Sequence, residues 1–302
     1  MTENIDKIVL KSFWNGLYTH PMYNEYRKYF AQVLEDVLKY YDKAEVYSIF
    51  EGEKPSKGDK EKNKNILYVQ YSGEGTADKD HQLYDINLVP GVASIKPLII
   101  PLTLGGQHLY VHDLWNRLYA TRNYDLDHNP KNKPGYDKFC CFIVSNGNPY
   151  ERRAFYSYLN QYRKVDSCGH FNNTIGYLLP EFDTEPYYEF IEHYKFMICF
   201  ENQKRQNYFT EKLINAYIAK TIPIYWGCPN VPDFLNLDAI IYIDTFDEES
   251  IRNSINRIVE LDQDPEKYKK VYEQPLFKNN EIPDELSQDY IRKMINRNYE
   301  MK

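Results

Sequence analysis

Short apolar runs separated by polar segments make up the first half of the chain. Five runs have the length of β-strands: Ile8–Phe13, Val46–Phe50, Ile66–Tyr71, Leu83–Val89 and Ile95–Leu104. The run Ile66–Tyr71 alternates in the manner of a strand and stops at a Ser-Gly pair. Tyr23–Tyr41 instead carries Leu, Val and Tyr at helical spacing. The pattern predicts strands alternating with helices.

Two polar segments interrupt this pattern. Glu51–Asn65 is charged and contains Pro and Gly, which predicts a solvated loop. Asp125–Lys138 carries two Pro and a Gly and is the best candidate for a domain boundary. We therefore expect one domain over residues 1–137 and a second over 138–280. A terminal helix is expected in 281–302, and its packing back on the first domain is one arrangement to test.

The second half shows a clearer order of elements. Four apolar runs predict strands: Phe139–Val144, Phe196–Phe200, Ile222–Trp226 and Ala239–Ile243. Tyr150–Tyr162 and Thr210–Lys220 predict helices, the second with Thr210 as its N-cap. A repeated strand–helix–strand order favours an α/β fold with a parallel, doubly wound sheet.

Composition and charge limit the kinds of partner. The chain has 302 residues, 42% of them hydrophobic, which is enough for two domains with apolar cores. Its net charge of −7 argues against nucleic acid as the main partner. The 30 tyrosines give weak support to sugar binding, because amphipathic rings suit polyhydroxylated ligands.

Cysteine usage and the N-terminus bear on the compartment. The five cysteines form no CxxC pair and mostly lie in apolar runs, which predicts free, buried thiols. The first eleven residues are polar and charged, unlike a signal peptide. No apolar run approaches the roughly 18 residues of a membrane-spanning helix. We expect a reduced, cytoplasmic protein, with peripheral attachment to a membrane left open.

Two strand ends of the second half carry candidate chemistry. Ligands of an open parallel sheet bind beyond the carboxyl ends of its strands. There, Arg152 and Arg153 stand at one helix start and Lys212 at another, which fits a pyrophosphate. Glu211 would repel phosphate and instead suits the hydroxyls of a ribose. The alternative is that these are ordinary solvated helix charges, and neither GxGxxG nor GxxxxGK[ST] is present.

Three segments resemble a known family. YKFMICFENQKRQNYFTEKLINAYIAKTIPIYWGCPNVPDF, from Tyr194 to Phe234, looks like the signature of the α-1,3/1,4-fucosyltransferases, glycosyltransferase family ten. Phe142–Leu159 and Cys168–Tyr177 resemble the upstream motifs of that family. Asn215 stands where the family usually has Asp. The resemblance is strong over residues 139–246, weaker over 1–138, and looks closer to compact bacterial members than to animal ones.

The resemblance implies a fold and a donor site. The family has the glycosyltransferase B architecture, in which two Rossmann-like domains face each other across a cleft. Arg152 and Lys212 would hold the pyrophosphate of a GDP-sugar, and Glu211 the ribose. Further candidates follow from the matched motifs: Asn202, Tyr208 and Tyr177 on the donor, with Trp14 and Asn15 on the acceptor side. Glu201 is a structural candidate rather than a ligand-binding one.

Glu74 is the residue that the resemblance implies as catalytic base. In YSGEG it follows a strand and a glycine, where the family keeps a carboxylate in a similar setting. Gly75 departs from the usual Asn of the family, and a solvated turn glutamate is the alternative. An inverting transfer needs such a base to take the proton of the acceptor hydroxyl, while the leaving diphosphate is stabilised by cations and helix N–H groups.

The expected function is therefore fucosyl transfer with inversion. L-Fucose would pass from GDP-β-L-fucose to the 3-OH of N-acetylglucosamine in a β-galactosyl (LacNAc-type) glycan. One alternative keeps the fold and uses another GDP- or NDP-deoxysugar or another acceptor, since Lys204–Asn207 departs from related bacterial loops. A non-catalytic sugar-nucleotide-binding relative is the other alternative. Partners are the donor and the glycan, with the oligomeric state undetermined.

Two metal-like patterns carry less weight. Asp125-Leu126-Asp127 is a DxD sequence, but it lies in the predicted boundary without a donor motif around it. His108 and His112 have the helical spacing of two metal ligands, but no HExxH arrangement is present, so a plain histidine pair is favoured. We expect no obligatory cofactor and no bound metal, and leave stimulation by a divalent cation open.

Overall fold

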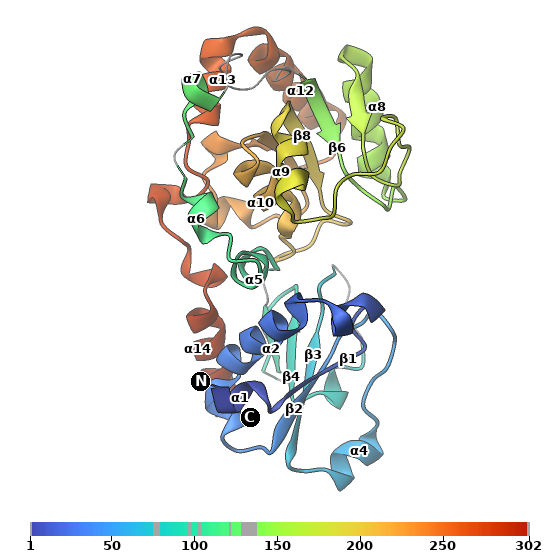
Figure 1. Ribbon diagram of the computed structural model, residues 1–302, viewed down its shortest axis with the longest axis vertical. Helices are drawn as coiled ribbons and strands as arrows, with labels where there is room; N and C mark the ends of the chain where they lie inside the picture. The colour runs from blue at the N-terminus through green and yellow to red at the C-terminus, as the bar shows by residue number, and fades with distance from the viewer. Residues whose placement is uncertain are drawn as a thin grey trace. The chain divides into compact units, whose positions relative to one another are not determined.

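The chain divides into two compact units in a computed structural model (Figure 1). The model describes residues 2–74, 79–95, 98–101, 104–120, 122–127 and 138–300. The first unit comprises 1–114, 205–208 and 282–302, and the second comprises 115–204 and 209–281. The division after Leu114 lies earlier than the expected boundary at 137, and the short segment Arg205–Tyr208 belongs to the first unit.

The first unit is built on a five-stranded parallel sheet. Its strands stand in chain order, β1-β2-β3-β4-β5, and span Ile8–Lys11, Lys43–Tyr47, Ile66–Tyr71, Ile86–Val89 and Ile99–Pro101. Val46 pairs with Val69 and Tyr71 with Leu88, so the apolar runs of neighbouring strands are in register. The predicted strands are thus present, with shifts of a few residues at their ends.

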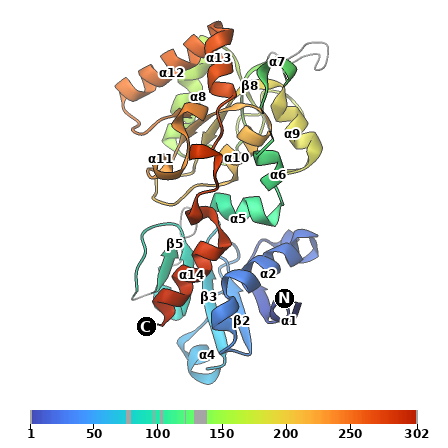
Figure 2. The same ribbon diagram turned by 90° about the vertical axis from the view of Figure 1, so that its left-hand side faces the viewer.

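Helices α2 (Met22–Val33), α5 (Leu104–Val111) and α14 (Gln288–Tyr299) belong to this unit. Helix α14 packs along α2, as both views show (Figure 2). Ile291 and Ile295 of α14 join the apolar core that contains Phe30 and Leu34. The amphipathic pattern of the terminal segment therefore serves to bury one face of α14 in the first unit.

The second unit has a five-stranded parallel sheet with a different order, β10-β9-β8-β6-β7. Its strands in chain order span Lys138–Phe142, Val165–Ser167, Tyr194–Phe200, Ile222–Trp226 and Ile241–Tyr242. The chain leaves β6 for β7 on one side and then returns to place β8 on the other side of β6. The β6–β8 pair is therefore the topological switch point, where ligands of such sheets bind.

The helices of this unit include α8 (Tyr150–Tyr162), α9 (Glu185–Glu192), α10 (Glu211–Ile218), α12 (Glu248–Gln263) and α13 (Pro265–Tyr272). Helix α8 matches its prediction, and α10 is two residues shorter than predicted at its C-terminal end. The apolar core combines β-strand residues such as Phe196 and Ile224 with Phe155 of α8 and Ile258 of α12. Both sheets are parallel, as the strand–helix order indicates.

The solvated loop predicted over residues 51–65 is wrong in part. Lys57–Lys62 forms a short helix, α4, because Ser56 and Asp59 make a reciprocal capping box. The Ser56 hydroxyl accepts from the Asp59 backbone N–H at 3.1 Å, and the Asp59 carboxylate accepts from the Ser56 N–H at 2.8 Å. The capping box was not recognised in the sequence because it lies within a run of lysines and acidic residues.

Arg122 explains why the segment after Leu114 packs in the second unit. Its guanidinium carbon lies 4.4 Å from the ring centre of Tyr217 and 4.0 Å from that of Tyr272. The Asp127 carboxylate accepts from Lys220 at 2.6 Å and from the Tyr272 hydroxyl at 2.9 Å. The second Asp of the DxD sequence is thus bound to side chains of the second unit, and Asp125 pairs with Lys269.

The cysteines and the helices agree with the simpler features of the sequence. All five cysteines are free and buried. Burial raises the pKa of the Cys140, Cys141 and Cys199 thiols well above the ordinary value, so these side chains are unreactive packing groups. Among the described residues, none of the helices has the length and apolar character needed to cross a bilayer.

Candidate donor site

The switch point of the second sheet brings together the loops that follow β6 and β8. Arg152, from the first turn of α8, links these two loops. Its Nε and Nη2 donate to the Phe200 carbonyl at the end of β8, at 3.1 and 2.6 Å, and Nη1 donates to the Asn146 carbonyl at 2.9 Å. Arg152 is only 1% exposed, so its charge is buried between the two loops. Arg153 donates to the carbonyls of Gly147 and Asn148 in the same loop.

Glu201 follows β8 directly, and its carboxylate is fully buried. Oε1 accepts from the Thr210 backbone N–H at 2.8 Å, from the Thr210 hydroxyl at 3.0 Å and from the Tyr225 hydroxyl at 3.4 Å. Oε2 accepts from the Thr210 hydroxyl at 2.8 Å and lies 3.5 Å from Lys212 Nζ. Burial raises the pKa of Glu201, and the positive charge of Lys212 opposes that shift.

Thr210 occupies the predicted N-cap position of α10, with extended backbone dihedrals. Its side chain makes no capping bond to the helix, which corrects the expected role of its hydroxyl. The hydroxyl donates to Glu201 and accepts from Lys212 Nζ at 3.1 Å. The Thr210 hydroxyl thus has a carboxylate as its acceptor and the Lys212 ammonium group as its donor, in place of a first-turn N–H group.

Lys212 lies in the first turn of α10 with three oxygen atoms around its ammonium group. Nζ is 3.0 Å from Glu211 Oε1, 3.1 Å from Thr210 Oγ1 and 3.5 Å from Glu201 Oε2. The Lys212 side chain is 18% exposed and that of Glu211 29%. A lysine at this end of a helix opposes the helix dipole unless an anion is near. Glu201 is such an anion within the protein, which the sequence reasoning missed.

Gly227 explains how a buried carboxylate fits behind β9. A Cβ on Gly227 would lie 2.4 Å from Glu201 Cγ and 2.6 Å from Glu201 Cβ. Its φ of +149° is also one that side chains rarely tolerate. The Trp226-Gly227 pair of the signature segment therefore leaves room for the Glu201 side chain.

Two other donor-site candidates are more exposed than Glu201. Asn202 is half-buried and stands directly after Glu201. Tyr177, in the loop after β7, is 53% exposed, and its carbonyl accepts from Asn173 Nδ2 at 3.0 Å. Asn173 Oδ1 also accepts from the N–H groups of Ile175 and Gly176, so one amide shapes this turn.

Glu74 and Tyr208 meet in the first unit. Glu74 follows β3 and is half-buried, and its backbone N–H donates to the Ser72 hydroxyl at 3.2 Å. The Tyr208 hydroxyl donates to Glu74 Oε2 at 3.3 Å, while the Tyr208 ring is 1% exposed in the core of this unit. The sequence assigned the two residues to different domains. Gly75, whose departure from the family pattern was noted, lies outside the described residues.

The segment Lys204–Asn207 has contacts in both units. Lys204 Nζ donates to the Asp244 carbonyl at 2.6 Å within the second unit. Asn207 adopts a φ of +58°, and its Nδ2 donates to the Gly91 carbonyl at 2.7 Å within the first unit. The backbone conformation suits Asn, which tolerates left-handed dihedrals better than most residues. The bonds place Tyr208 beside Glu74.

The acceptor-side candidates lie in an aromatic group after β1. Trp14 is 37% exposed, and its ring meets those of Tyr26 and Phe50 edge-on, with centres 5.6 and 5.9 Å apart. Asn15 is exposed and begins a short 3-10 helix, η1 (Asn15–Thr19). Exposed aromatic faces are a usual feature of carbohydrate-binding surfaces, but no contact joins these residues to Glu74 among the bonds described.

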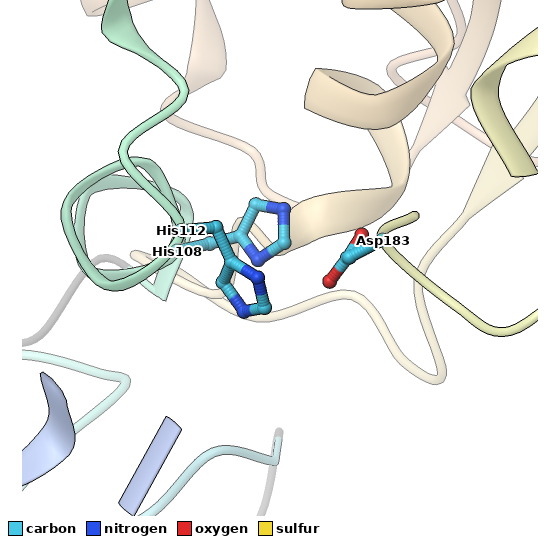
Figure 3. A group of neighbouring side chains, drawn as sticks. All are labelled: His108, His112 and Asp183. Atoms are coloured by element: carbon cyan, nitrogen blue, oxygen red, sulfur yellow. The ribbon is translucent and has the colours of Figure 1, made fainter. Parts of the chain in front are cut away.

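The two histidines at helical spacing are a ring pair on one helix. His108 and His112 lie side by side on and just after α5, with ring centres 4.6 Å apart (Figure 3). Figure 3 also labels Asp183, which belongs to the second unit and accepts there from Asn215 Nδ2 at 2.7 Å and from the Tyr188 hydroxyl at 3.2 Å. Asn215, which replaces the usual Asp of the family, is thus a fully buried partner of Asp183.

Comparison with known proteins identifies the second unit. The model of glycosyltransferase family 10 (fucosyltransferase), C-terminal part, matches residues 133–280. An α-(1,3)-fucosyltransferase of Helicobacter pylori is 41% identical over 128 residues, which are 38% of this chain and 26% of that protein. A 4-galactosyl-N-acetylglucosaminide 3-α-L-fucosyltransferase of Mus musculus is 29% identical over 119 residues, or 39% of this chain and 32% of that protein.

A solved structure matches almost the whole fold. The crystal structure of an α1,3-fucosyltransferase with GDP-fucose superposes with a TM-score of 0.70 at 22% identity, over 97% of this chain and 90% of that chain. That likeness confirms an α/β fold with two Rossmann-like units. The matches to the curated relatives cover about a quarter to a third of their lengths. Residues 133–280, just under half of the chain, therefore form a C-terminal domain of glycosyltransferase family 10, the fucosyltransferases.

Proposed function

We propose that the protein transfers L-fucose from GDP-β-L-fucose to the 3-OH of N-acetylglucosamine in a LacNAc-type glycan, with inversion. One observation carries this proposal: at the switch point, the first turn of α10 presents Lys212 beside Glu211. A helix N-terminus with a lysine suits a diphosphate, and a neighbouring carboxylate suits the ribose hydroxyls. The family match of residues 133–280 and the activities named for the two relatives support the sugar and the linkage.

The donor-site residues then have separate tasks. Lys212 and the first-turn N–H groups of α10 bind the diphosphate and stabilise its charge as the bond to fucose breaks. Glu211 binds the ribose. Arg152 serves the diphosphate site chiefly by fixing the two loops, since its guanidinium donates to backbone carbonyls. Asn202, Tyr208 and Tyr177 contribute to donor binding, and Trp14 and Asn15 contact the acceptor.

Glu74 is the proposed general base. It takes the proton of the acceptor 3-OH as that oxygen attacks the anomeric carbon from the face opposite GDP. The transition state resembles an oxocarbenium ion, so charge develops on the sugar while it accumulates on the leaving diphosphate. The Tyr208 hydroxyl, 3.3 Å from Glu74 Oε2, helps hold the carboxylate in one orientation. No covalent intermediate is required.

A binding and product assay tests the proposal. Calorimetry with GDP, UDP and CDP should show binding of GDP only, and incubation with GDP-fucose and LacNAc should give an α-1,3-linked product by NMR. A protein that binds GDP but transfers a different deoxysugar, or uses another acceptor, would change the substrate assignment and leave the donor site in place. No GDP binding at millimolar concentration would overturn the proposal.

A further inference from the structure

Glu201 connects three parts of the signature segment through one carboxylate. It is the central residue of the FEN sequence, its partners Thr210 and Lys212 belong to the TEK sequence, and Tyr225 belongs to the YWG sequence. The carboxylate is fully buried, so it has no route to a substrate through solvent. A buried charge needs partners to offset its lost hydration, and two of these partners, Thr210 and Lys212, stand at the start of α10.

The hydrogen bonds have a definite direction. Lys212 Nζ donates to the Thr210 hydroxyl, and that hydroxyl has a single hydrogen to donate onward to Glu201. The Thr210 backbone N–H points to Glu201 as well. Glu201 therefore orients Thr210, and Thr210 in turn holds the ammonium group of Lys212 at the first turn of α10.

This arrangement has a consequence for the helix end. A Thr at the N-cap normally accepts from an N–H group of the first turn and so occupies it. The Thr210 hydroxyl instead donates to Glu201 and accepts from Lys212 Nζ, and its side chain makes no capping bond to α10. A diphosphate at this helix start would therefore meet Lys212 in the position that this link gives it.

We infer that Glu201 is a positioning residue of the donor site. Its carboxylate binds Thr210 and, through the Thr210 hydroxyl, holds Lys212 in place, so that the lysine faces the donor diphosphate. The inference rests on the proposed function, because it needs a diphosphate to bind at α10. It goes beyond a structural role for Glu201, since it makes diphosphate affinity depend on Glu201 through Lys212.

A double-mutant cycle on GDP affinity tests this coupling. Glu201→Gln keeps the side-chain volume but removes the charge and replaces one acceptor oxygen by an NH₂ donor. We expect GDP to bind about 10-fold more weakly, the size of one charge-assisted hydrogen bond, as measured by calorimetry. If Glu201 acts through Lys212, the Glu201→Gln/Lys212→Ala protein should bind GDP no more weakly than Lys212→Ala alone.

Tyr225→Phe is the matched control. It removes another hydrogen bond to Glu201, at 3.4 Å, but leaves the link through Thr210 to Lys212 intact. This variant should lower the melting temperature and leave GDP affinity unchanged. If Glu201→Gln does not fold, Thr210→Val tests the same link, because it removes only the hydroxyl between Lys212 and Glu201.

The outcomes separate the inference from the proposed function. A wild-type protein that binds no GDP overturns the proposed function, and the inference with it. If wild type binds GDP and Glu201→Gln binds it with equal affinity, the inference alone is overturned. The inference would also be overturned if the losses of GDP affinity for Glu201→Gln and Lys212→Ala add in the double variant, because a general loosening of α10 predicts additive effects. A loss of GDP affinity for Tyr225→Phe as large as that for Glu201→Gln would overturn it as well.

Discussion

Each of the two sheets has five parallel strands, and the two sheets differ in the order of those strands. In the first unit the order follows the chain from β1 to β5, whereas the second reverses between β6 and β8. Ligands of parallel sheets bind at such a reversal, between the loops at the strand ends. The proposed donor site therefore lies in the second unit because of the strand order of its sheet.

The buried polar side chains of the two units also differ, in whether they carry a charge. Gln70 and Asn87, on β3 and β4, are buried amides that share the His81 ring nitrogen at 2.9 and 3.2 Å. At the switch point the buried groups are instead charged, Glu201 and Arg152. Neutral amides stabilise a sheet at modest cost, whereas buried charges are costly and usually mark function. Glu74 is the carboxylate by which the first unit would join the reaction.

The largest effect is expected for Glu74→Gln. The amide keeps the shape of the side chain but cannot accept a proton, so the rate of transfer should fall by about 10³-fold. GDP affinity should stay within about twofold of wild type, because the proposed diphosphate and ribose ligands, Lys212 and Glu211, belong to the second unit. Steady-state rates and calorimetry measure the two quantities. Normal transfer by the variant would show that Glu74 is not the base. Weak GDP binding by the variant would show that donor binding also depends on the first unit.

Gly227→Ala tests the space that the second unit reserves for a buried charge. The new Cβ would lie 2.4 Å from Glu201 Cγ at a φ of +149°, so we expect a loss of about 3 kcal/mol in the free energy of unfolding. Gly176→Ala is the control, because its φ of +78° is also positive but nothing lies within 4 Å. It should cost about 1 kcal/mol, by denaturant unfolding. Equal losses would show that backbone strain, rather than Glu201, explains the requirement for Gly227.

Lys212→Ala should weaken donor binding without removing catalysis. Loss of one cation at a diphosphate typically costs about 2 kcal/mol, or roughly 30-fold in GDP affinity. At saturating donor, transfer should persist at a reduced rate. Calorimetry against Lys220→Ala, a lysine of the same unit paired with Asp127, provides the control for charge alone. Similar affinities for Lys212→Ala and wild type would mean that the diphosphate binds elsewhere.

Much of this comparison could be predicted from the sequence. The apolar runs gave the parallel sheets because strand–helix alternation permits few arrangements, and helix α8 was predicted with its observed ends. The candidate cations at two helix starts also follow from local pattern. The three-residue strand β7 was not predicted, because it carries too few residues for a period to appear. The strand predicted over Ala239–Ile243 is present as β10, which is only two residues long.

What the sequence could not supply is long-range pairing. A glutamate directly after a fully apolar strand was the available signal for Glu201, but burial and its bonds to Thr210 and Tyr225 depend on the sheet being formed. The same holds for Tyr208, whose hydroxyl meets Glu74 across 134 residues of chain. The cations of α8 were predicted to face a pyrophosphate, and nothing in their local pattern indicated that the folded loop supplies carbonyl oxygens to both arginines.

The smallest effect is expected for Asp262→Asn, which tests whether low pH destabilises the second unit. Burial alone would raise the pKa of Asp262, but hydrogen bonds from Lys195 and Arg163, at 2.9 and 3.0 Å, outweigh it and hold the pKa below its ordinary value. The carboxylate therefore stabilises the fold above its unfolded pKa, and this contribution is lost as the pH falls through the lowered folded value.

The Lys195 and Arg163 side chains are 25% and 45% exposed, so solvent screens the pairs and we expect about 1 kcal/mol at pH 7. In melts from pH 7 to pH 3, the difference between Asp262→Asn and wild type should shrink as the pH falls. Glu45→Gln is the counterpart in the first unit, where Lys43 and Tyr47 likewise lower the pKa of a carboxyl against the effect of burial. GDP binding is also measured as the pH falls. If only Asp262→Asn makes GDP binding less dependent on pH, acid acts by destabilising the second unit. An equal effect of Glu45→Gln would mean that the two units unfold together.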